Sequence, residues 1–447
     1  MNSRDPKTQK VIRQRIQALK HTLSKEDLED QLGAAMQTRY CKRVPMEVAI
    51  WFVVGVGMFS ADAYRQIFRW LSPLGTPIPG SSTLTEVRKR VGPELIKNLY
   101  LKVVRLLGTV KNQVGFYQGL RLMAIDGFVL DLFDSPENRK AFGRPKNNHG
   151  FGAFPQARCL ALAELGTHVI WRTVIGKYLQ GEHTLIKQLF QYLSKEMLIL
   201  MDRNFLSFEI VHEIIGKRAQ FLIRCRNDRL LPVIKRLSDG SYLSRVYRNR
   251  YDQQKDCHGI VVRVIEYTLD DPNRVGCGEL HRLVTSLLDH RQHPAVDLIK
   301  LYHQRWEEEL AIDELKTHLR QRPVLRSQRP EGVRQEIYAL LISHFIIRKI
   351  AFDASRKAGV CPTRISFTAT VKILQSKLAE VTIVGRVEKW YQLIVQQAAS
   401  ELIPPRSGRI NPRVKKRKSS SWTRKRDIHR KPKQPKYHFD QAIVILV

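Results

Sequence analysis

A change in hydrophobic pattern near residue 120 constrains the fold of this chain more than any other feature of its sequence. Short apolar segments replace helical ones there. RLMAID, MLILM and QFLIRC each predict a strand, and ARCLALAEL and THVIWRTVIG, joined by a glycine, predict a β-hairpin. Glu182–Leu193 and FLSFEIVHEIIGK, between the later strands, are helical in pattern. The order strand, hairpin, helix, strand, helix, strand predicts a mixed α/β sheet.

Helical segments flank this α/β region. Residues 1 to about 110 are helical in pattern: Ser24 predicts one helix start, and VPMEVAIWFVVGVGMF predicts a buried helix with Pro45 near its first turn. Residues 227–285 are rich in strand patterns and polar turns, which predicts an insertion into the α/β domain. One long helix is predicted from about Ala295 to Arg320, and further helices follow to about Ala399.

The chain is strongly basic, because 76 Lys and Arg oppose 42 Asp and Glu and give a formal net charge of +34. Such a charge favours a densely anionic partner, since each neutralised phosphate releases condensed counterions. Charge alone leaves nucleic acid, an anionic membrane surface and a ribosome-bound or structural role open. The cations are densest between Arg406 and Lys436, where fourteen Lys or Arg accompany one acid, Asp427. This stretch is expected to be flexible until it meets a polyanion.

Cysteine spacing and hydropathy exclude several other classes. The six cysteines are scattered without a CxxC spacing, which predicts neither a zinc cluster nor a disulfide framework and favours a reducing compartment. The segment MNSRDPKTQK has no apolar signal core. The longest apolar run, Ala49–Phe59, is well short of the roughly 20 residues that span a bilayer. No membrane segment is therefore predicted.

Two aspartates follow buried strand patterns. Asp126 ends the run LMAI, and Asp202 ends the run LILM. A carboxylate directly after a buried strand costs desolvation free energy unless it has a partner, so both positions invite a functional explanation. The alternative, that each aspartate only caps the next turn or helix, stays open on these two residues alone.

The segment LYHQRWEEELAIDELK carries four residues with the spacing Y-x2-R-x3-E-x6-K, namely Tyr302, Arg305, Glu309 and Lys316. At about 100° per residue, all four fall within about 60° of one another on one helical face. Glu307 and Glu308 are predicted to point elsewhere, and Asp313 is the competing acid on this face. An ordinary exposed helix with i,i+4 ion pairs would explain the charges, but neither the tyrosine nor the two aspartates.

These motifs resemble those of the DDE transposases of the insertion-sequence-four family. AIDG around Asp126 is similar to the family's first-aspartate motif and MDRNF around Asp202 to its second, and LYHQRWEEELAIDELKTHLR matches its YREK signature at all four positions. The resemblance continues through LRSQRPEGVRQEIYALL and ISFT and covers most of the chain. It implies an α/β fold: a ribonuclease-H-like mixed sheet, interrupted by a β-rich insertion and flanked by helical N-terminal and C-terminal regions.

The resemblance also implies an activity, that of a cut-and-paste transposase that binds terminal inverted repeats and catalyses strand cleavage and strand transfer. It assigns catalysis and metal binding to Asp126, Asp202 and Glu309, with Mg²⁺ as cofactor and Mn²⁺ as a substitute. DNA contacts are assigned to the other signature residues, Tyr302, Arg305 and Lys316. The implied partner is double-stranded DNA, both transposon ends and target, bound by a homodimer. The expected location is the bacterial cytoplasm, in association with the nucleoid and not with a membrane.

One departure from the family concerns tryptophan. Relatives with a hairpin step use a Trp in the insertion to stack on a flipped base, whereas no Trp lies in 207–305 here. Trp306 is a candidate for base stacking, and a packed helix residue is the alternative. Two other functions stay open: a ribonuclease-H-like endonuclease, which would not need the extra Tyr and Lys, and a non-catalytic DNA-end-binding protein, which would not need the triad.

Together the patterns and the resemblance predict six parts of the chain. They are a helical N-terminal DNA-binding region at 1–112, the first part of the catalytic domain at 113–226, the β-rich insertion at 227–290, the catalytic helix at 291–325, C-terminal helices at 326–402 and a basic tail at 403–447.

Overall fold

A computed structural model describes residues 6–23, 44–109, 115–147, 150–273, 277–404 and 435–446. The chain forms two compact units, one of Met1–Met197 with Arg305–Ile403 and one of Leu198–Gln304 with Pro404–Val447. The predicted helix start at Ser24 and nearly all of the basic stretch between 406 and 436 lie outside the described residues.

The sheet of the first unit is built on three antiparallel strands: β2 (Leu120–Leu132), β5 (Gln156–Glu164) and β6 (Val169–Lys177). Two short strands extend β2, since β1 (Phe116–Tyr117) pairs with it antiparallel and β13 (Val324–Leu325) pairs with it in parallel. The strands β5 and β6 confirm the predicted hairpin. A separate two-stranded sheet pairs β3 (Lys146–Asn147) with β4 (Gly150–Phe151).

The position of Asp126 in the strand differs from the prediction. Asp126 does not end a strand; it lies in the middle of β2, opposite Ala161 of β5, and the pairing continues to Asp131 opposite Gln156. The dipeptide Asp126–Gly127 has the composition of a turn, but the ladder to β5 holds it extended. The alternating residues after Gly127 then carry the strand on to Leu132.

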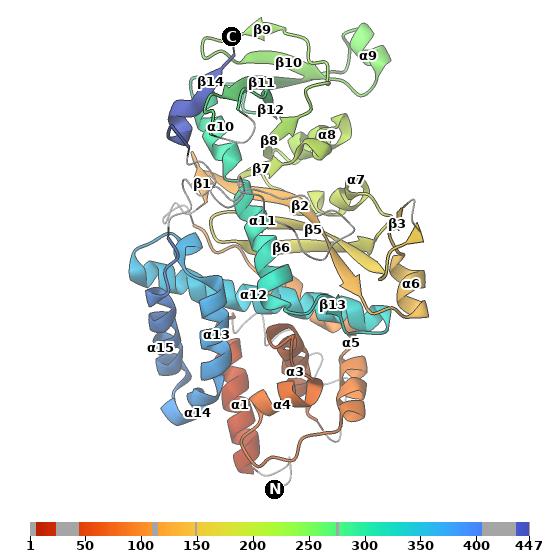
Figure 1. The fold of residues 1–447 in the computed structure, drawn as a ribbon, viewed down its shortest axis with the longest axis vertical. Coiled ribbons are helices and arrows are strands. Elements are labelled where there is room, and N and C mark those ends of the chain that lie inside the picture. The colour runs from red at the N-terminus through yellow and green to blue at the C-terminus, as the bar shows by residue number, and fades with distance from the viewer. Residues whose placement is uncertain are drawn as a thin grey trace. The chain divides into compact units, whose positions relative to one another are not determined.

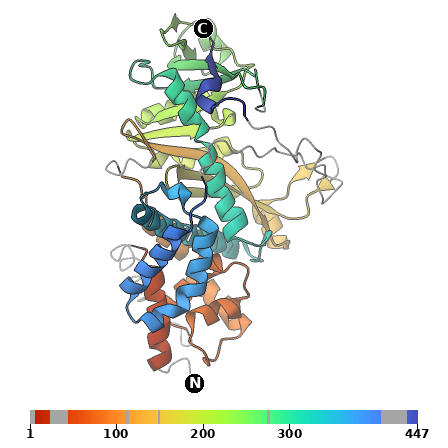
Figure 2. The ribbon, with the colours of Figure 1, turned by 60° about the vertical axis from the view of Figure 1, so that its left-hand side comes forward.

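Helices enclose the sheet of the first unit. The long helix α12 (Pro330–Ala358) packs against β6 and against four helices of the same unit, as Figures 1 and 2 show: α3 (Met46–Met58), α5 (Ser81–Val103), α13 (Phe367–Lys377) and α15 (Val387–Ser400). Helix α3 begins directly after Pro45, as predicted, and its side chains are almost all buried. Gly57 permits close packing there, because a Cβ at this position would lie 2.3 Å from the carbonyl oxygen of Ala339.

The first unit contains further helices among its described residues. They are α1 (Pro6–Lys20), α4 (Tyr64–Leu71), α6 (Pro136–Phe142), α7 (Glu182–Leu185), α11 (Trp306–Asp313) and α14 (Val381–Val384). The described parts of residues 1–110 are thus mainly helical, and so is the region from α12 to the end of α15 at Ser400, as predicted. Glu182–Leu193 is not one helix, since α7 gives way to 3-10 turns at Ile186–Gln188 and Phe190–Tyr192.

The single long helix predicted from Ala295 to Arg320 is wrong. Helix α10 (Ala295–His303) ends before a turn at 304–305, α11 follows, and Glu314–Leu319 is a π-helix. The turn coincides with the passage of the chain from the second unit to the first. Hydrophobic periodicity does not reveal the turn at 304–305 or the change to a π-helix at Glu314, because the buried residues keep a nearly helical spacing throughout α10, α11 and the π-helix. Short π-helical segments occur frequently at functional sites.

The second unit combines a parallel strand pair with an antiparallel extension. Strands β7 (Met197–Met201) and β8 (Gln220–Cys225) are parallel and are connected through α8 (Phe208–Gly216), which Ser207 caps. Beyond β8 the antiparallel order is β12 (His281–Thr285), β11 (Ile260–Leu269), β10 (Tyr242–Val246) and β9 (Lys235–Arg236). A short helix, α9 (Arg250–Gln254), precedes β11.

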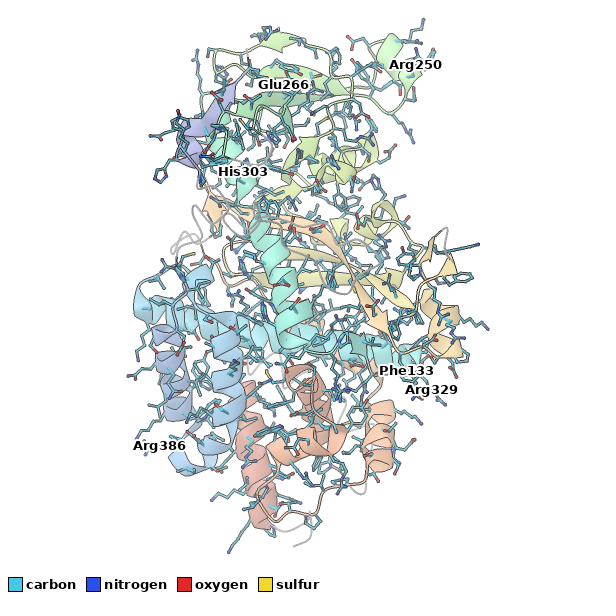
Figure 3. The ribbon with its side chains drawn as sticks, in the orientation of Figure 1. Phe133, Arg250, Glu266, His303, Arg329 and Arg386 are labelled. Atoms are coloured by element: carbon cyan, nitrogen blue, oxygen red, sulfur yellow. The ribbon has the colours of Figure 1, made fainter. Side chains whose placement is uncertain are left out.

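The C-terminal segment docks on this extension. Strand β14 (Ile443–Ile445) pairs antiparallel with the end of β11, and the buried carboxylate of Asp271 accepts hydrogen bonds from the backbone of Lys436 and Tyr437. Phe439 lies edge-on to His303, which Figure 3 shows near the end of α10. The described C-terminal residues 435–446 therefore dock on the second unit.

The predicted fold class is confirmed. The fold is mixed α/β: the first unit contains the antiparallel strands β6, β5 and β2, the second contains the parallel pair β7 and β8 with the β-rich insertion β9 to β12, and helices flank the α/β region. Among the described residues, no helix combines the length and apolar character needed to span a bilayer.

Candidate active site

Asp126 of β2 occupies a half-buried position in the first unit. Its Oδ1 atom accepts a hydrogen bond from the backbone N–H of Gly127 at 2.7 Å. Burial, the largest effect, raises the pKa of Asp126 to about 6, and the charges of Glu309 and Glu182 act in the same direction. The Gly127 hydrogen bond and Arg305 oppose this rise. A carboxylate whose pKa is raised by burial next to other acids is typical of functional sites.

Arg305 links Asp126 to Glu309. Its Nη1 atom lies 3.7 Å from Oδ2 of Asp126, and its Nη2 atom donates to Oε1 of Glu309 at 3.1 Å. The Arg305 side chain is 11% exposed, and the two carboxylates are 26% and 31% exposed. Helix α11 packs against β2, β5 and β6, which brings this part of the signature onto the sheet. Two of the three predicted carboxylates therefore converge on one guanidinium.

Two further glutamates near Asp126 were missed by sequence reasoning. Glu308 is completely buried, and this burial, followed by the charge of Asp126, raises its pKa well above the ordinary value. Glu308 was predicted to point away from the site. Its side chain instead lies inside the protein near Asp126. Helical angles alone could not show this, because they give the direction of a side chain around the helix axis but not which faces of the helix pack against the rest of the protein.

Glu182, the first residue of α7, is the second missed carboxylate. A Cβ on Gly127 would lie 2.3 Å from Oε1 of Glu182, so only glycine leaves room for this contact beside Asp126. Glu182 also lies 3.5 Å from Nη1 of Arg158. The glycine after Asp126 was the one available signal, because an Asp-Gly pair inside a strand indicates a close approach by another group.

Asp202 and Tyr302 come together in the second unit. Asp202 follows β7 directly, as predicted, and its Oδ1 atom accepts the backbone N–H of Arg203 at 2.6 Å. The buried Tyr302 donates its hydroxyl to the carbonyl oxygen of Met201 at 3.2 Å, one residue before Asp202. The tyrosine of the signature thus fixes the strand end that carries the second aspartate.

The remaining signature residues lie on α11 and the π-helix. Trp306 begins α11 and is 45% exposed. Lys316 lies within the π-helix and is half-buried. The competing acid, Asp313, is exposed and accepts a hydrogen bond from Thr317 at 2.6 Å. Asp313 is thus turned toward its own helix and solvent.

The donor chemistry fits a hard divalent cation. Asp126, Asp202 and Glu309 offer only carboxylate oxygens, the ligands that Mg²⁺ and Mn²⁺ accept. Burial raises the pKa of Asp126 first, and the charges of Glu309 and Glu182 add to the rise; a bound cation would offset both effects. Within the described ranges, no three His, Cys, Asp or Glu side chains are grouped closely enough to hold a metal by themselves.

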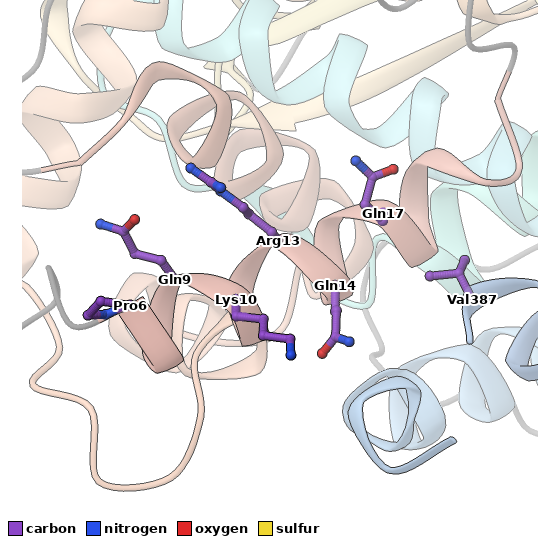
Figure 4. A pocket seen from close by; sticks show the side chains of 7 residues that line it. All are labelled: Pro6, Gln9, Lys10, Arg13, Gln14, Gln17 and Val387. Carbon is purple, nitrogen blue, oxygen red and sulfur yellow. The ribbon is translucent and has the colours of Figure 1, made fainter. Parts of the chain in front are cut away.

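A pocket of about 330 Å³ lies apart from these carboxylates, between α1 and the start of α15 (Figure 4). Lys10 and Arg13 are exposed on its α1 side, and Val387 closes the other side. Three glutamines complete the lining, namely Gln9, Gln14 and Gln17. No acid occurs anywhere in α1.

Comparisons with known proteins show the family of this chain. Residues 117–346 match the family model of the transposase DDE domain, and residues 13–101 match that of the insertion element 4 transposase N-terminal region. The chain is 26% identical, over 384 residues that cover 84% of it and 86% of the relative, to transposase InsG for insertion sequence element IS4 of Escherichia coli (strain K12). A piggyBac transposase synaptic complex with hairpin DNA aligns with a TM-score of 0.43 and 12% identity, over 86% of this chain and 85% of that one. This chain belongs to the insertion element 4 family of DDE transposases.

Proposed function

We propose that this transposase works by cut-and-paste: it binds the terminal inverted repeats of its element, cleaves the strands there by hydrolysis and joins the resulting 3′ hydroxyls to target DNA. The observation that carries the proposal is the convergence of Asp126 and Glu309 on Arg305, with the pKa of Asp126 raised to about 6. Such a pair of carboxylates suits metal-dependent phosphoryl transfer.

The cofactor belongs to this proposal. DDE transposases generally use a divalent metal, and we infer Mg²⁺, replaceable by Mn²⁺, held by Asp126, Asp202 and Glu309. When bound, it would supply charge stabilisation for the attacking and leaving oxygens. Arg305 would hold the carboxylates of Asp126 and Glu309 at a fixed separation before the ion enters, because it contacts both.

DNA contacts are proposed for the remaining signature residues. Arg305 and Lys316 are cations that could bind the scissile phosphate. Tyr302 would hold Asp202 in place, because its hydroxyl donates to the carbonyl oxygen of Met201 at the end of β7. Trp306 is exposed enough to stack on a base. A homodimer that bridges two element ends is proposed as the working assembly.

The exposed face of α1 is proposed as part of the N-terminal DNA-binding surface. Lys10 and Arg13 suit phosphate contact, and arginine and glutamine side chains can also read base edges in a major groove. The net charge of +34 supports DNA as the partner. In this proposal α1 provides part of the contact with element ends, while the carboxylates provide the chemistry.

A single plasmid assay separates this proposal from its alternatives. A supercoiled plasmid that carries the reading frame and its flanking DNA is incubated with the protein, Mg²⁺ and a second target plasmid. We expect excision at the element ends and joined products in the target. Cleavage without joining would indicate a ribonuclease-H-like endonuclease, and retardation of end fragments without cleavage would indicate a DNA-end-binding protein.

A further inference from the structure

A buried polar cluster in the first unit forms hydrogen bonds with two residues, one on either side of Glu309 in the chain. Nε2 of His168 lies 2.6 Å from Oε2 of Glu307, and Nδ1 of the same ring lies 3.0 Å from Oε1 of Glu314. Arg348 of α12 donates from Nε to Oε2 of Glu314 at 2.7 Å and also contacts Oε1. We call these four residues, His168, Glu307, Glu314 and Arg348, the helix clamp.

Burial of the helix clamp costs desolvation free energy, and the ion pairs and hydrogen bonds among its members offset that cost. His168 is fully buried, Arg348 is 1% exposed and Glu314 is 5% exposed. Charges removed from water destabilise a fold by several kcal/mol unless they are paired and hydrogen-bonded. Burial, the largest effect, favours the neutral acid, but the charge of Arg348 and the hydrogen bond with His168 hold the pKa of Glu314 well below its ordinary value. His344 adds a further contact, with Nε2 3.4 Å from Oε2 of Glu314.

His168 also occupies a conformation that few side chains adopt. It ends the turn between β5 and β6 with a φ of 60°, in the left-handed region. Residues other than glycine are uncommon there, and their persistence points to a role for the side chain. The ring is the part of His168 that reaches α11, so the turn presents an imidazole to the helix although its backbone conformation is unfavourable.

The spacing of the contacts explains what the clamp controls. Glu307 and Glu314 are seven residues apart, about two helical turns, so they lie on the same face of the helix. Glu309 is two residues after Glu307 and projects about 200° around the axis, toward the opposite side. Because one imidazole contacts two residues about two turns apart, it fixes the rotation of the helix, and with it the direction of Glu309 toward Asp126 and Arg305.

We propose that the helix clamp is a positioning device that sets the orientation of Glu309 for DNA cleavage. This inference rests on the proposed function, because it takes Glu309 as a member of the cleavage site. In this proposal the clamp residues act through the helix and not directly on the DNA. Their removal should lower the cleavage rate constant at saturating DNA and leave DNA affinity nearly unchanged.

Two pairs of variants test the proposal in the full-length protein. Glu314→Gln is compared with Glu336→Gln, which makes the same change at a residue that is 3% exposed, lies on α12 and bonds Ser327 instead of the clamp. His168→Gly, which removes the ring and suits a positive φ, is compared with His168→Asn, which tolerates that φ and retains a polar group. Cleavage is measured on the plasmid with the element's flanking DNA, together with the melting temperature and the Kd for a fragment that carries one element end.

The expected result is a kcat for Glu314→Gln and His168→Gly lower by on the order of 10²-fold, with Kd within about twofold of wild type. Glu336→Gln should lose similar stability but keep kcat within about threefold, and His168→Asn should recover part of the loss. If Glu314→Gln does not fold, the His168 pair decides. Full kcat in His168→Gly and Glu314→Gln, while Glu309→Ala is inactive, would overturn the clamp alone. Normal cleavage by Glu309→Ala would instead overturn the proposed function.

Discussion

The Nη2 atom of Arg305 lies 3.1 Å from Oε1 of Glu309, one helical turn further along the chain. The same guanidinium reaches Asp126 of β2 through its other terminal nitrogen. A residue of the YREK signature thus links the first and third predicted carboxylates, which are 183 positions apart (309 − 126). The pKa of Asp126, which depends on these contacts, can therefore be tested through the stability of the protein.

Asp126 should reduce the stability of the metal-free protein at neutral pH. Its folded-state pKa is raised from 3.8 to about 6, so the folded protein binds the proton more tightly than the unfolded chain. Its stabilising contribution is present below about pH 4 and is lost as the pH rises through about 6. Asp126→Asn should therefore raise the free energy of unfolding by up to about 3 kcal/mol at pH 7.5 and much less at pH 4.

Thermal unfolding in the presence of a chelator measures this difference. Asp134→Asn serves as a control of opposite sign, because Arg139 lowers the pKa of Asp134 to about 2. Asp134→Asn should lose stability above pH 4, whereas Asp126→Asn should gain it. An Asp126→Asn variant that melts below wild type at pH 7.5 would show that burial does not govern this carboxylate.

The choice of metal should separate binding from cleavage. Mg²⁺ and Mn²⁺ should support strand cleavage, whereas Ca²⁺ should permit complex formation with little chemistry, because its longer and looser coordination places the reacting oxygens poorly. Gel retardation and plasmid cleavage, measured in parallel with each ion, provide the comparison. Robust cleavage in excess chelator would refute a metal-dependent mechanism.

The exposed face of α1 should contribute to DNA affinity. Lys10→Ala with Arg13→Ala should weaken binding to an element-end fragment and flatten the slope of log affinity against log salt by roughly 0.9 for each phosphate that the variant no longer neutralises. The matched control is Lys217→Ala with Lys255→Ala, which removes two exposed cations of the second unit. Equal reductions of affinity in both double variants would mean that only net charge matters and that α1 is not a DNA-binding surface.

The basic stretch 406–436 should raise affinity for specific and random DNA alike. Truncation after Leu402 is a poor test, because it would also remove β14 and the backbone groups that bind Asp271. Replacing Lys415, Lys416, Arg417 and Lys418 with Gln keeps that docking segment in the chain. Both affinities should fall by a similar factor, with a shallower salt slope. Unchanged slopes would exclude this stretch as a DNA contact.

Much of the fold could be predicted, because local patterns decide it. MLILM and QFLIRC form β7 and β8, and ARCLALAEL with THVIWRTVIG form the hairpin of β5 and β6. The central position of Asp126 in β2 could not be read from its sequence, since Asp-Gly also suits a turn. The breaks after His303 and at Glu314 escaped prediction for a similar reason: tertiary contacts cause them, and the local pattern stays helical.

The candidate site was predictable only in part. The spacing placed Arg305 beside Glu309, and the structure has that contact. It could not show that Glu308 is buried near Asp126, that Glu182 approaches Gly127 or that Glu307 binds His168. Those contacts join residues up to 182 positions apart (308 − 126), and no periodicity within one helix encodes them.

The most direct test of the proposed catalytic carboxylates is the DNA cleavage rate of two neighbouring variants, Glu309→Gln and Glu308→Gln, in Mg²⁺. Glu309→Gln removes a proposed metal ligand and should lower the rate on the order of 10³-fold or more, with end binding retained. Glu308→Gln should stay within about threefold of wild type, because Glu308 is completely buried, its burial disfavours the charged form, and glutamine has nearly the same shape. Normal cleavage by Glu309→Gln, together with an inactive Glu308→Gln, would contradict the account and transfer the third carboxylate to Glu308.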